Sequence, residues 1–266
     1  MDKNKKLPIS AIIVGFNEEN LIKDCLESVL FCDEILFFDL GSADNTLSVA
    51  KGIEGIKVQT HGLVPYAEYI HCEYKDTTKH DWILILDPDE KISDGLKSEL
   101  IELFDKGIPD DIAAIHVPWI FYFKKKRLLG TPWGGVNAKS ILFNRHRNNI
   151  GTYVHRSRSV IEPYKEMKLE YKGNNFVYHF WMQNYKALLQ KHLRYLKHEP
   201  ESQSTQGVTT TIKAILKTPY IEFKRAFISN KGYKDKSRGL FLSAFWAWYQ
   251  TSALIGLYRY QLKNKK

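Results

Sequence analysis

The sequence is poor in cysteine and lacks the glycine-rich loops that bind phosphate in two common nucleotide-binding folds. Its three cysteines, Cys25, Cys32 and Cys72, show no Cys-x-x-Cys spacing, so neither a disulfide framework nor a cysteine zinc site is indicated. Neither GxGxxG nor GxxxxGK[ST] occurs. These absences argue against a Rossmann dehydrogenase and a P-loop NTPase, and the cysteine usage fits a reducing cytoplasm.

A long uninterrupted apolar run is also missing. The basic start "MDKNKK" leads into a short apolar run that ends at "NEEN" without a small-residue cleavage site, so we expect no signal peptide. The most apolar segment, 239–260, is interrupted by Ser243, Gln250, Thr251 and Ser252. Because basic residues flank this aromatic segment, two interpretations stay open: a helix in a membrane interface, or a helix packed on the catalytic domain.

Acidic residues are in the minority. Lysine and arginine number 39 against 30 aspartate and glutamate, which gives a formal net charge of +9. An excess of positive charge favours an anionic partner, but it does not choose among a nucleotide diphosphate, an anionic membrane surface and nucleic acid.

The first hundred residues alternate strand and helix patterns. Strands are expected at 7–16, 33–42, 56–60 and 81–87, with helices at 18–31, 43–52 and, more weakly, 65–79. Apolar strands separated by helices predict a parallel sheet with right-handed crossovers. A helix follows Ser93, and the middle third has short strands and loops. From about Trp181 the chain is expected to be helical, with Pro200 ending the first helix. The predicted organisation is a catalytic domain over 1–180 and a C-terminal helical region over 181–266.

Polar side chains gather where the predicted strands end. They fall in three groups: Asn17-Glu18-Glu19, Asp39 with Asp44, and Asp87-Pro88-Asp89. Each group alone could be a turn or a helix cap. Ligands of parallel sheets bind beyond the carboxyl ends of the strands, so the three groups together predict a binding site there. Asp-x-Asp after an apolar strand suits Mg²⁺ or Mn²⁺ bridging a diphosphate.

Two stretches resemble family-2 glycosyltransferases of the GT-A fold. "ISAIIVGFNEENLIKDCLESVLFCDEILFFDLGSADNTLSVAK" is similar to the family's opening, and "DWILILDPDEKIS" is similar to its Asp-x-Asp strand end. The resemblance is closest to the bacterial subset of lipopolysaccharide-core and related envelope enzymes, with later landmarks in "GTYVH", "VYHFW", "KHLRYLKHE" and "YKDKSRGLFLSAFWAWYQ". It implies an α/β, Rossmann-like, mostly parallel sheet flanked by helices, followed by a C-terminal helical region.

The resemblance also implies roles for the strand-end residues. Glu18 and Asp39 would contact the uracil or ribose of a nucleotide sugar, and Asp44 would help shape that pocket. Asn17 is a further candidate for binding the nucleotide. Asp87 would face the ribose and the metal, and Asp89 would be the principal metal ligand.

Histidines and the missing base leave further alternatives open. His155 and His179 lie in aromatic settings, and each is either a metal or phosphate ligand or a structural histidine. Two positions depart from the subset. His71-Cys72 replaces a basic residue followed by Asn, and Val154-His155-Arg156 replaces Val-His-Glu. If the missing glutamate is the general base, the candidates here are Glu90, His155 and Glu162.

Several surface groups allow two interpretations. "KKKR" at 124–127 and "RHR" at 145–147 are either solvated or in contact with an anionic acceptor or lipid headgroup. Trp119, Trp133 and Trp181 either stack on sugar faces or pack in a core.

The sequence therefore predicts a metal-dependent, inverting glycosyltransferase that uses Mn²⁺ or Mg²⁺ and a UDP-linked donor. Its acceptor would be a glycan or glycolipid of bacterial envelope polysaccharide or lipopolysaccharide synthesis. The protein would be cytoplasmic or peripheral on the inner face of the cytoplasmic membrane, and no nucleic acid partner is expected. One alternative is a catalytically degenerate GT-A protein that acts as a basic, membrane-associated binding module. Another is a sugar nucleotidyltransferase, although the acidic "GFNEEN" stands where such an enzyme needs a basic, glycine-rich loop.

Overall fold

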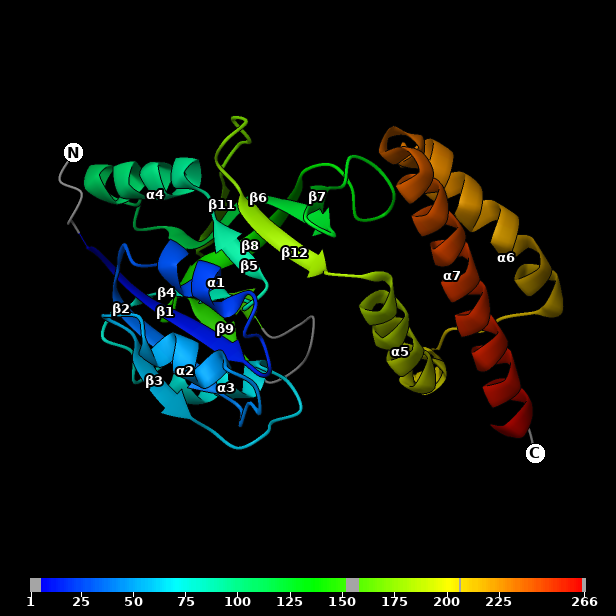
Figure 1. Cartoon of the computed structure of the whole chain (residues 1–266), viewed down its shortest axis with the longest axis horizontal. Helices are drawn as coiled ribbons and strands as arrows, with labels where there is room; N and C mark the ends of the chain where they lie inside the picture. The colour runs from blue at the N-terminus through cyan, green and yellow to red at the C-terminus, as the bar shows by residue number, and fades with distance from the viewer. Residues whose placement is uncertain (1–5, 152–157, 206, 265–266) are drawn as a thin grey trace. The chain divides into compact units, whose positions relative to one another are not determined.

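The computed structural model describes residues 6–151, 158–205 and 207–264, and it divides into two compact units (Figure 1). Unit 1 comprises Met1–Trp119 and Val136–His179, and unit 2 comprises Ile120–Gly135 and Phe180–Lys266. The domain boundary between 180 and 181 that the sequence suggested stays a prediction. Residues 120–135 belong with the C-terminal helices, which the sequence did not indicate.

Unit 1 is built on four parallel strands in the order β3-β2-β1-β4. The strands and their connecting helices are β1 (Leu7–Gly15), α1 (Ile22–Ser28), β2 (Cys32–Asp39), α2 (Thr46–Lys51), β3 (Lys57–Thr60), α3 (Glu68–Tyr74) and β4 (Trp82–Leu86). Strand β1 is apolar on both faces because its side chains alternate between two buried clusters. Ile9 and Ile13 pack in a cluster with residues of α1 and α2, whereas Ile12 and Val14 pack in a second cluster with Ile70 of α3.

The other strands of the sheet are mostly antiparallel, and they continue from β4 in the order β8-β6-β12-β5. Their bounds are β5 (Glu90–Ile92), β6 (Ile112–Phe123), β8 (Asn137–Asn144) and β12 (Val177–Met182), with β7 (Lys126–Arg127) and β11 (Lys165–Lys168) beside β6. β9 (Asn148–Ile150) and β10 (Arg158–Val160) form a separate pair. Helix α4 (Asp94–Lys106) begins at Ser93, whose hydroxyl accepts a hydrogen bond from the amide of Leu96. The expected α/β class is confirmed, with a parallel half that positions the strand ends.

Unit 2 is helical apart from the ends of β6 and β12 and the short β7. It contains α5 (Tyr185–Thr205), α6 (Ile212–Lys224), a π-helical turn η1 (Arg225–Ser229), a 3₁₀ turn η2 (Gly232–Asp235) and α7 (Lys236–Asn264). α7 packs against both α5 and α6. Pro200 does not end the first helix as expected, because α5 continues to Thr205. The Pro200 ring lies against Gly256 of α7, where an added Cβ would collide with it.

The apolar segment 239–260 lies inside α7 and supplies its packed side. Leu242, Ala253 and Leu257 are buried, while Leu240 and Trp248 are exposed. Over the described part of the chain, no helix combines the length and apolar character needed to cross a membrane.

Candidate active site

The loops after β1 and β2 form one side of the candidate site. They are neighbours because the two parallel strands end at the same position along the sheet. Gly15 of β1 is paired with Asp39 of β2. Asn17 joins the two loops: its amide donates to the Ser42 hydroxyl at 2.9 Å, and its side-chain oxygen accepts from the amide of Ala43 at 2.8 Å. Asn17 adopts a positive φ of 57°, a conformation that asparagine tolerates better than most residues.

Asp44 and Thr46 strengthen the same junction. The amide of Glu18 donates to the Thr46 hydroxyl at 2.7 Å, and the amide of Glu19 donates to Asp44 Oδ2 at 3.2 Å. Asp44 Oδ1 also accepts from the amide of Thr46, the first residue of α2. Asp44 therefore holds the loops after β1 and β2 together, and the half-buried Glu18 lies on the first of them.

Asp39 carries an unsatisfied acceptor at the end of β2. Its side chain is 1% exposed, and Oδ2 accepts from the amides of Gly41 at 3.1 Å and Ser42 at 3.0 Å. Oδ1 is buried and has no hydrogen-bond partner among the described residues. A buried acceptor without a donor is costly, so this oxygen is suited to a ligand N–H or hydroxyl group.

A tight turn at 87–90 leads from β4 into β5. The carbonyl of Asp87 accepts from the amide of Glu90 at 2.9 Å, and the amide of Asp87 donates to Glu90 Oε2 at 3.0 Å. The indole of Trp119 donates to Glu90 Oε1 at 2.7 Å. The Glu90 carboxylate is 0% exposed and fastens the turn from inside. Its role as a general base stays a prediction, and both of its oxygens are engaged in this structure.

Lys139 of β8 supplies the cation that compensates the crowded carboxylates. Its ammonium lies 2.6 Å from Asp87 Oδ2 and 2.7 and 2.8 Å from the two oxygens of Glu90. Burial would raise the pKa of Asp87, but Lys139 outweighs burial and lowers it to about 2. Burial raises the pKa of Glu90, which Lys139 offsets only in part, and the two carboxylates raise the pKa of Lys139 against the effect of its own burial. A side chain of the protein thus compensates one of the two negative charges of Asp87 and Glu90.

Asp89 and His179 form a second polar pair at the turn, with side chains 24% and 10% exposed. His179 Nε2 lies 3.3 Å from Asp89 Oδ2, and the imidazole stacks on Trp119 with ring centroids 4.6 Å apart. Two neighbouring ligands of one octahedral Mg²⁺ or Mn²⁺ ion lie about 3 Å apart, so this pair fits two positions of such an ion. No group of three or more His, Cys, Asp or Glu side chains in the described part of the chain could hold a metal ion. The remaining ligands would therefore have to come from the substrate and from water.

A cavity of about 110 Å³ adjoins Asp87, and it is lined by Glu68, His71, Ile85, Asp87, Lys139, Ile150 and Arg158. Arg158 lies over the ring of Phe143, and its Nη1 is buried without a hydrogen-bond partner among the described residues. Burial lowers the pKa of His71 to about 4, so its imidazole is neutral at pH 7. The half-buried cations Lys139 and Arg158 face this cavity beside the carboxylates of Glu68 and Asp87, so they are the groups on its wall that could bind phosphate oxygens.

Sequence reasoning missed Lys139 and Arg158. Lys139 stands in "NAKSILFN", where a lysine in a strand that becomes apolar was the available signal. Arg158 carries no local signal in the sequence. His155 lies outside the described residues, and Glu162 is exposed.

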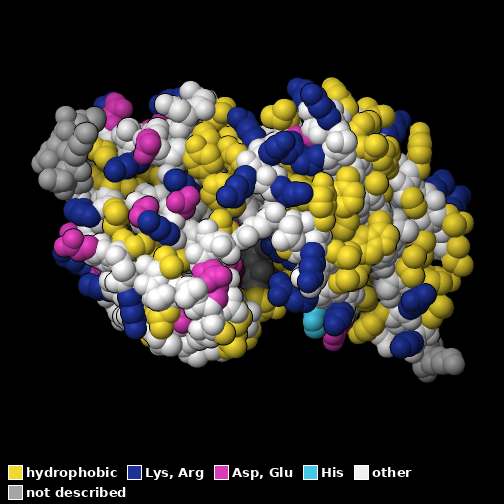
Figure 2. Space-filling model, viewed as in Figure 1, with side chains coloured by type: hydrophobic (Ala, Val, Ile, Leu, Met, Phe, Trp, Pro, Cys, Tyr) yellow, Lys and Arg dark blue, Asp and Glu magenta, His cyan; other side chains and the backbone are white. Residues whose placement is uncertain are grey.

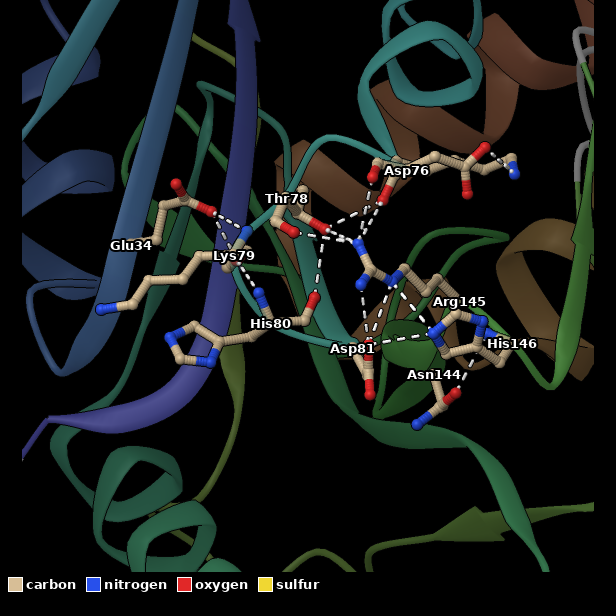
Figure 3. Close-up of polar contacts among 11 residues, drawn as sticks. Glu34, Asp76, Thr78, Lys79, His80, Asp81, Asn144, Arg145 and His146 are labelled. Carbon is tan, nitrogen blue, oxygen red and sulfur yellow. Dashed lines mark hydrogen bonds and ion pairs between the residues drawn. The ribbon is translucent and has the colours of Figure 1, made fainter.

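The basic stretch 145–147 makes its contacts at the other end of β4, before the strand begins (Figure 3). Arg145 Nη1 donates to the carbonyl of Thr78 at 2.9 Å, and its Nη2 lies 2.9 Å from Asp81 Oδ1. His146 Nε2 contacts the same oxygen at 3.0 Å. Asp81 directly precedes β4, whereas Asp87 directly follows it. Arg145 therefore anchors the loop 75–81 and is not placed for an acceptor at the candidate site.

The three tryptophans divide between the two units. Trp119 lies in the candidate site with Glu90 and His179. Trp133 and Trp181 pack on each other in unit 2, with ring centroids 4.3 Å apart, so core packing is their structural role. Lys124, in the stretch 124–127, lies over the ring of Tyr185 next to the β6–β7 turn.

Several known proteins resemble this chain over part of its length. The model of "Glycosyl transferase family 2" matches residues 10–193. An uncharacterized glycosyltransferase of Rickettsia typhi is 24% identical over 205 residues, which make up 75% of this chain and 69% of that protein. The lipopolysaccharide core biosynthesis glycosyltransferase LpsC of Rhizobium meliloti is 31% identical over 101 residues, 37% of each chain. Glucosyl-3-phosphoglycerate synthase of Mycobacterium tuberculosis, solved with Mn²⁺ and UDP-glucose, is 20% identical with a TM-score of 0.34 over 43% of each chain.

Proposed function

This chain belongs to glycosyltransferase family 2, and we propose that it transfers a sugar, with inversion, from a UDP-linked donor to a glycan or glycolipid acceptor. The observation that carries the proposal is the convergence of Asp39, Asp87 and Asp89 at one edge of the parallel strands. Gly15 pairs with Asp39, and Ile13 pairs with Leu86, so the ends of β2, β1 and β4 are level. The base, ribose and diphosphate of a nucleotide sugar follow one another along the molecule. In the same order, they match the buried acceptor oxygen of Asp39, the turn at 87–90 and the proposed cation site at Asp89 and His179.

Asp39 binds the nucleoside in this proposal. Its Oδ2 is held by two amides, so the carboxylate cannot rotate freely, and the buried Oδ1 accepts from the uracil imide or a ribose hydroxyl. Asn17 and Asp44 keep the two loops together around this carboxylate. Glu18, on the same loop as Asn17, contacts the uracil or ribose in this proposal.

Asp89 and His179 hold Mn²⁺ or Mg²⁺ in this proposal, and Asp87 faces the ribose beside them. A divalent ion bound there would supply positive charge to the departing diphosphate. The protein's own cations, Lys139 and Arg158, face the cavity next to Asp87 and bind phosphate oxygens. Glu90 fixes the turn so that Asp87 and Asp89 keep their places.

The acceptor belongs to bacterial envelope synthesis in this proposal. The partial similarity to LpsC, a lipopolysaccharide core biosynthesis enzyme, supports an envelope glycan or glycolipid made at the inner face of the cytoplasmic membrane. An inverting transfer needs a base within hydrogen-bond reach of the acceptor hydroxyl. Glu90, His155 and Glu162 remain the candidates.

Melting temperature and donor hydrolysis, measured together, test the proposal. UDP should raise the melting temperature of the wild type, and Mn²⁺ should increase that shift, because ligand that binds only the folded state stabilises it. Asp89→Ala and His179→Ala should lose the Mn²⁺-dependent part and the hydrolysis of UDP-sugars. Asp110→Ala is the matched control, since this exposed carboxylate lies near the start of β6, away from the strand ends.

Equal melting shifts in the wild type and Asp89→Ala, with and without Mn²⁺, would contradict the donor and metal assignment. GDP and CDP run in parallel, and a larger shift with either of them would contradict the choice of uridine while leaving a nucleotide donor in place.

A further inference from the structure

The charges of the chain are divided unequally between the two units. The sequence ranges of unit 2 contain 20 lysines and arginines but only 4 aspartates and glutamates. Those of unit 1 contain 19 and 26, so the catalytic unit is acidic and the whole basic excess belongs to unit 2. The face of unit 2 seen in Figure 2 accordingly shows hydrophobic side chains beside Lys and Arg side chains, with few acidic ones. Such a field attracts polyanions and anionic surfaces.

Helix α6 is the least covered helix of unit 2, and none of its residues is buried. Ile212 is 57% exposed, Leu216 76% and Tyr220 71%. These three follow one another at intervals of four residues, so they form one apolar stripe along the helix. Phe223 and Phe227, stacked on each other, extend the aromatic character of this end of the helix.

A basic stripe runs beside the apolar stripe. Lys213, Lys217 and Lys224 are exposed and share a face, at intervals of four and seven residues. The single carboxylate of α6, Glu222, is turned away from it: it accepts from the indole of Trp246 on α7 at 3.0 Å and pairs with Arg225. The exposed face of α6 thus combines an apolar stripe with adjacent lysines and leaves its one acid toward α7.

We propose that this face of α6, defined by Ile212, Leu216 and Tyr220 with Lys213 and Lys217, docks on the surface of an anionic lipid bilayer. An amphipathic helix with Lys on its polar side and aliphatic or aromatic residues on the other lies in the plane of a membrane interface. Lysines near anionic headgroups add electrostatic attraction. A nucleic acid would satisfy the lysines but would leave the apolar stripe in water. The inference rests on the proposed function in one respect, because it names the surface by which the enzyme meets a membrane-borne acceptor.

The docking surface differs from the one suggested by the sequence. Segment 239–260 is the most apolar, but in α7 its buried positions pack against α5 and α6. α6 is less apolar overall, yet its stripe is solvent-exposed. Exposure, and not hydropathy alone, therefore selects α6.

Vesicle co-sedimentation of the full chain tests the docking surface. Vesicles of phosphatidylcholine mixed with phosphatidylglycerol should bind the wild type, and vesicles of phosphatidylcholine alone should bind it much more weakly. Leu216→Glu and Tyr220→Glu should each abolish binding, since a carboxylate would face the bilayer. Lys213→Gln with Lys217→Gln should weaken binding by more than about tenfold. Leu63→Glu is the matched control, because Leu63 is 73% exposed but belongs to unit 1, and it should bind as the wild type does.

Three results would overturn the inference. The first is binding that does not depend on phosphatidylglycerol or is unchanged by Leu216→Glu. The second is a wild-type dimer that Leu216→Glu converts to a monomer, as seen by light scattering, since the stripe would then be a contact between copies. The third is an α6-dependent affinity for RNA without vesicle binding.

Donor hydrolysis in the same preparations separates this inference from the proposed function. Leu216→Glu should hydrolyse UDP-sugar in solution as the wild type does. Hydrolysis without vesicle binding would overturn only the docking surface, whereas vesicle binding without hydrolysis of any nucleotide sugar would overturn only the proposed donor chemistry.

Discussion

Lys139 lies between two carboxylates that come from the turn after β4, and the balance of charge there depends on it. Its ammonium contacts Asp87 and both oxygens of the fully buried Glu90. Without the ammonium, Glu90 would be a buried charge with only neutral donors. Removing one partner of a buried ion pair is strongly destabilising for that reason.

We expect Lys139→Met to lower the free energy of unfolding by about 3 to 5 kcal/mol, measured by denaturant titration. Adding Glu90→Gln should recover part of the loss, because the double variant no longer holds the unpaired, fully buried Glu90 carboxylate. Lys165→Met is the control: its pair with Asp111 is exposed, so the cost should stay below about 1 kcal/mol. Additive effects of Lys139→Met and Glu90→Gln would contradict the coupling.

His71 should make the stability of the fold depend on pH. Burial lowers its pKa from 6.5 to about 4 in the folded state. Between these values the unfolded chain binds a proton that the folded chain does not, so stability is full above pH 6.5 and falls as the pH falls toward 4. The loss amounts to at most about 3 kcal/mol.

The measurement is the denaturation midpoint of the wild type and His71→Gln at several pH values between 4 and 7, without metal or nucleotide. His71→Gln should have the flatter profile, because the titrating group is gone. His198→Gln, an exposed histidine of α5, serves as the control. Parallel profiles for the wild type and His71→Gln would contradict the neutral, buried state of His71.

At the scale of elements, the sequence predicted the features that depend on the local pattern of apolar and polar residues. The four strands and the helices between them were predictable because continuous apolar runs such as "AIIVG" and "ILIL" are typical of buried parallel strands. The three polar groups at the strand ends were predictable for the same reason, since the carboxyl ends of parallel strands share one edge. Locating β1, β2 and β4 therefore located Asp39, Asp87 and Asp89.

Features that depend on contacts between distant parts of the chain were not predictable. Lys139 contacts Asp87, which lies 52 residues away in the sequence, and no local pattern indicates that pair. The same holds for α5, which continues past Pro200 and packs this proline against Gly256 of α7. The exposed face of α6 is another case, because hydropathy alone ranks segment 239–260 above it. Burial in the folded chain, which a single sequence does not display, separates the two helices.

At the scale of the whole molecule, the chain leaves the catalytic unit and returns to it. Residues 120–135 enter unit 2 before Val136–His179 completes unit 1. Within unit 2, the buried Asp235 accepts hydrogen bonds from the amides of Leu129 and Gly130, and Trp133 packs on Trp181 and Trp246. The helices after residue 179 thus hold the loop 128–135 in place.

A chain ending at His179 should consequently fold poorly, although it contains all of the catalytic unit. It would lose Asp235, the acceptor of two amides of the loop, and would expose Trp133 to water. We expect a lower melting temperature and increased binding of a hydrophobic dye relative to the full chain, because the loop has lost its packing. Co-expression of residues 180–266 as a separate chain should restore the melting temperature, since it supplies Asp235, Trp181 and Trp246 again. Cooperative melting of the shortened chain at the temperature of the full chain, without dye binding, would show that unit 1 does not depend on the C-terminal helices.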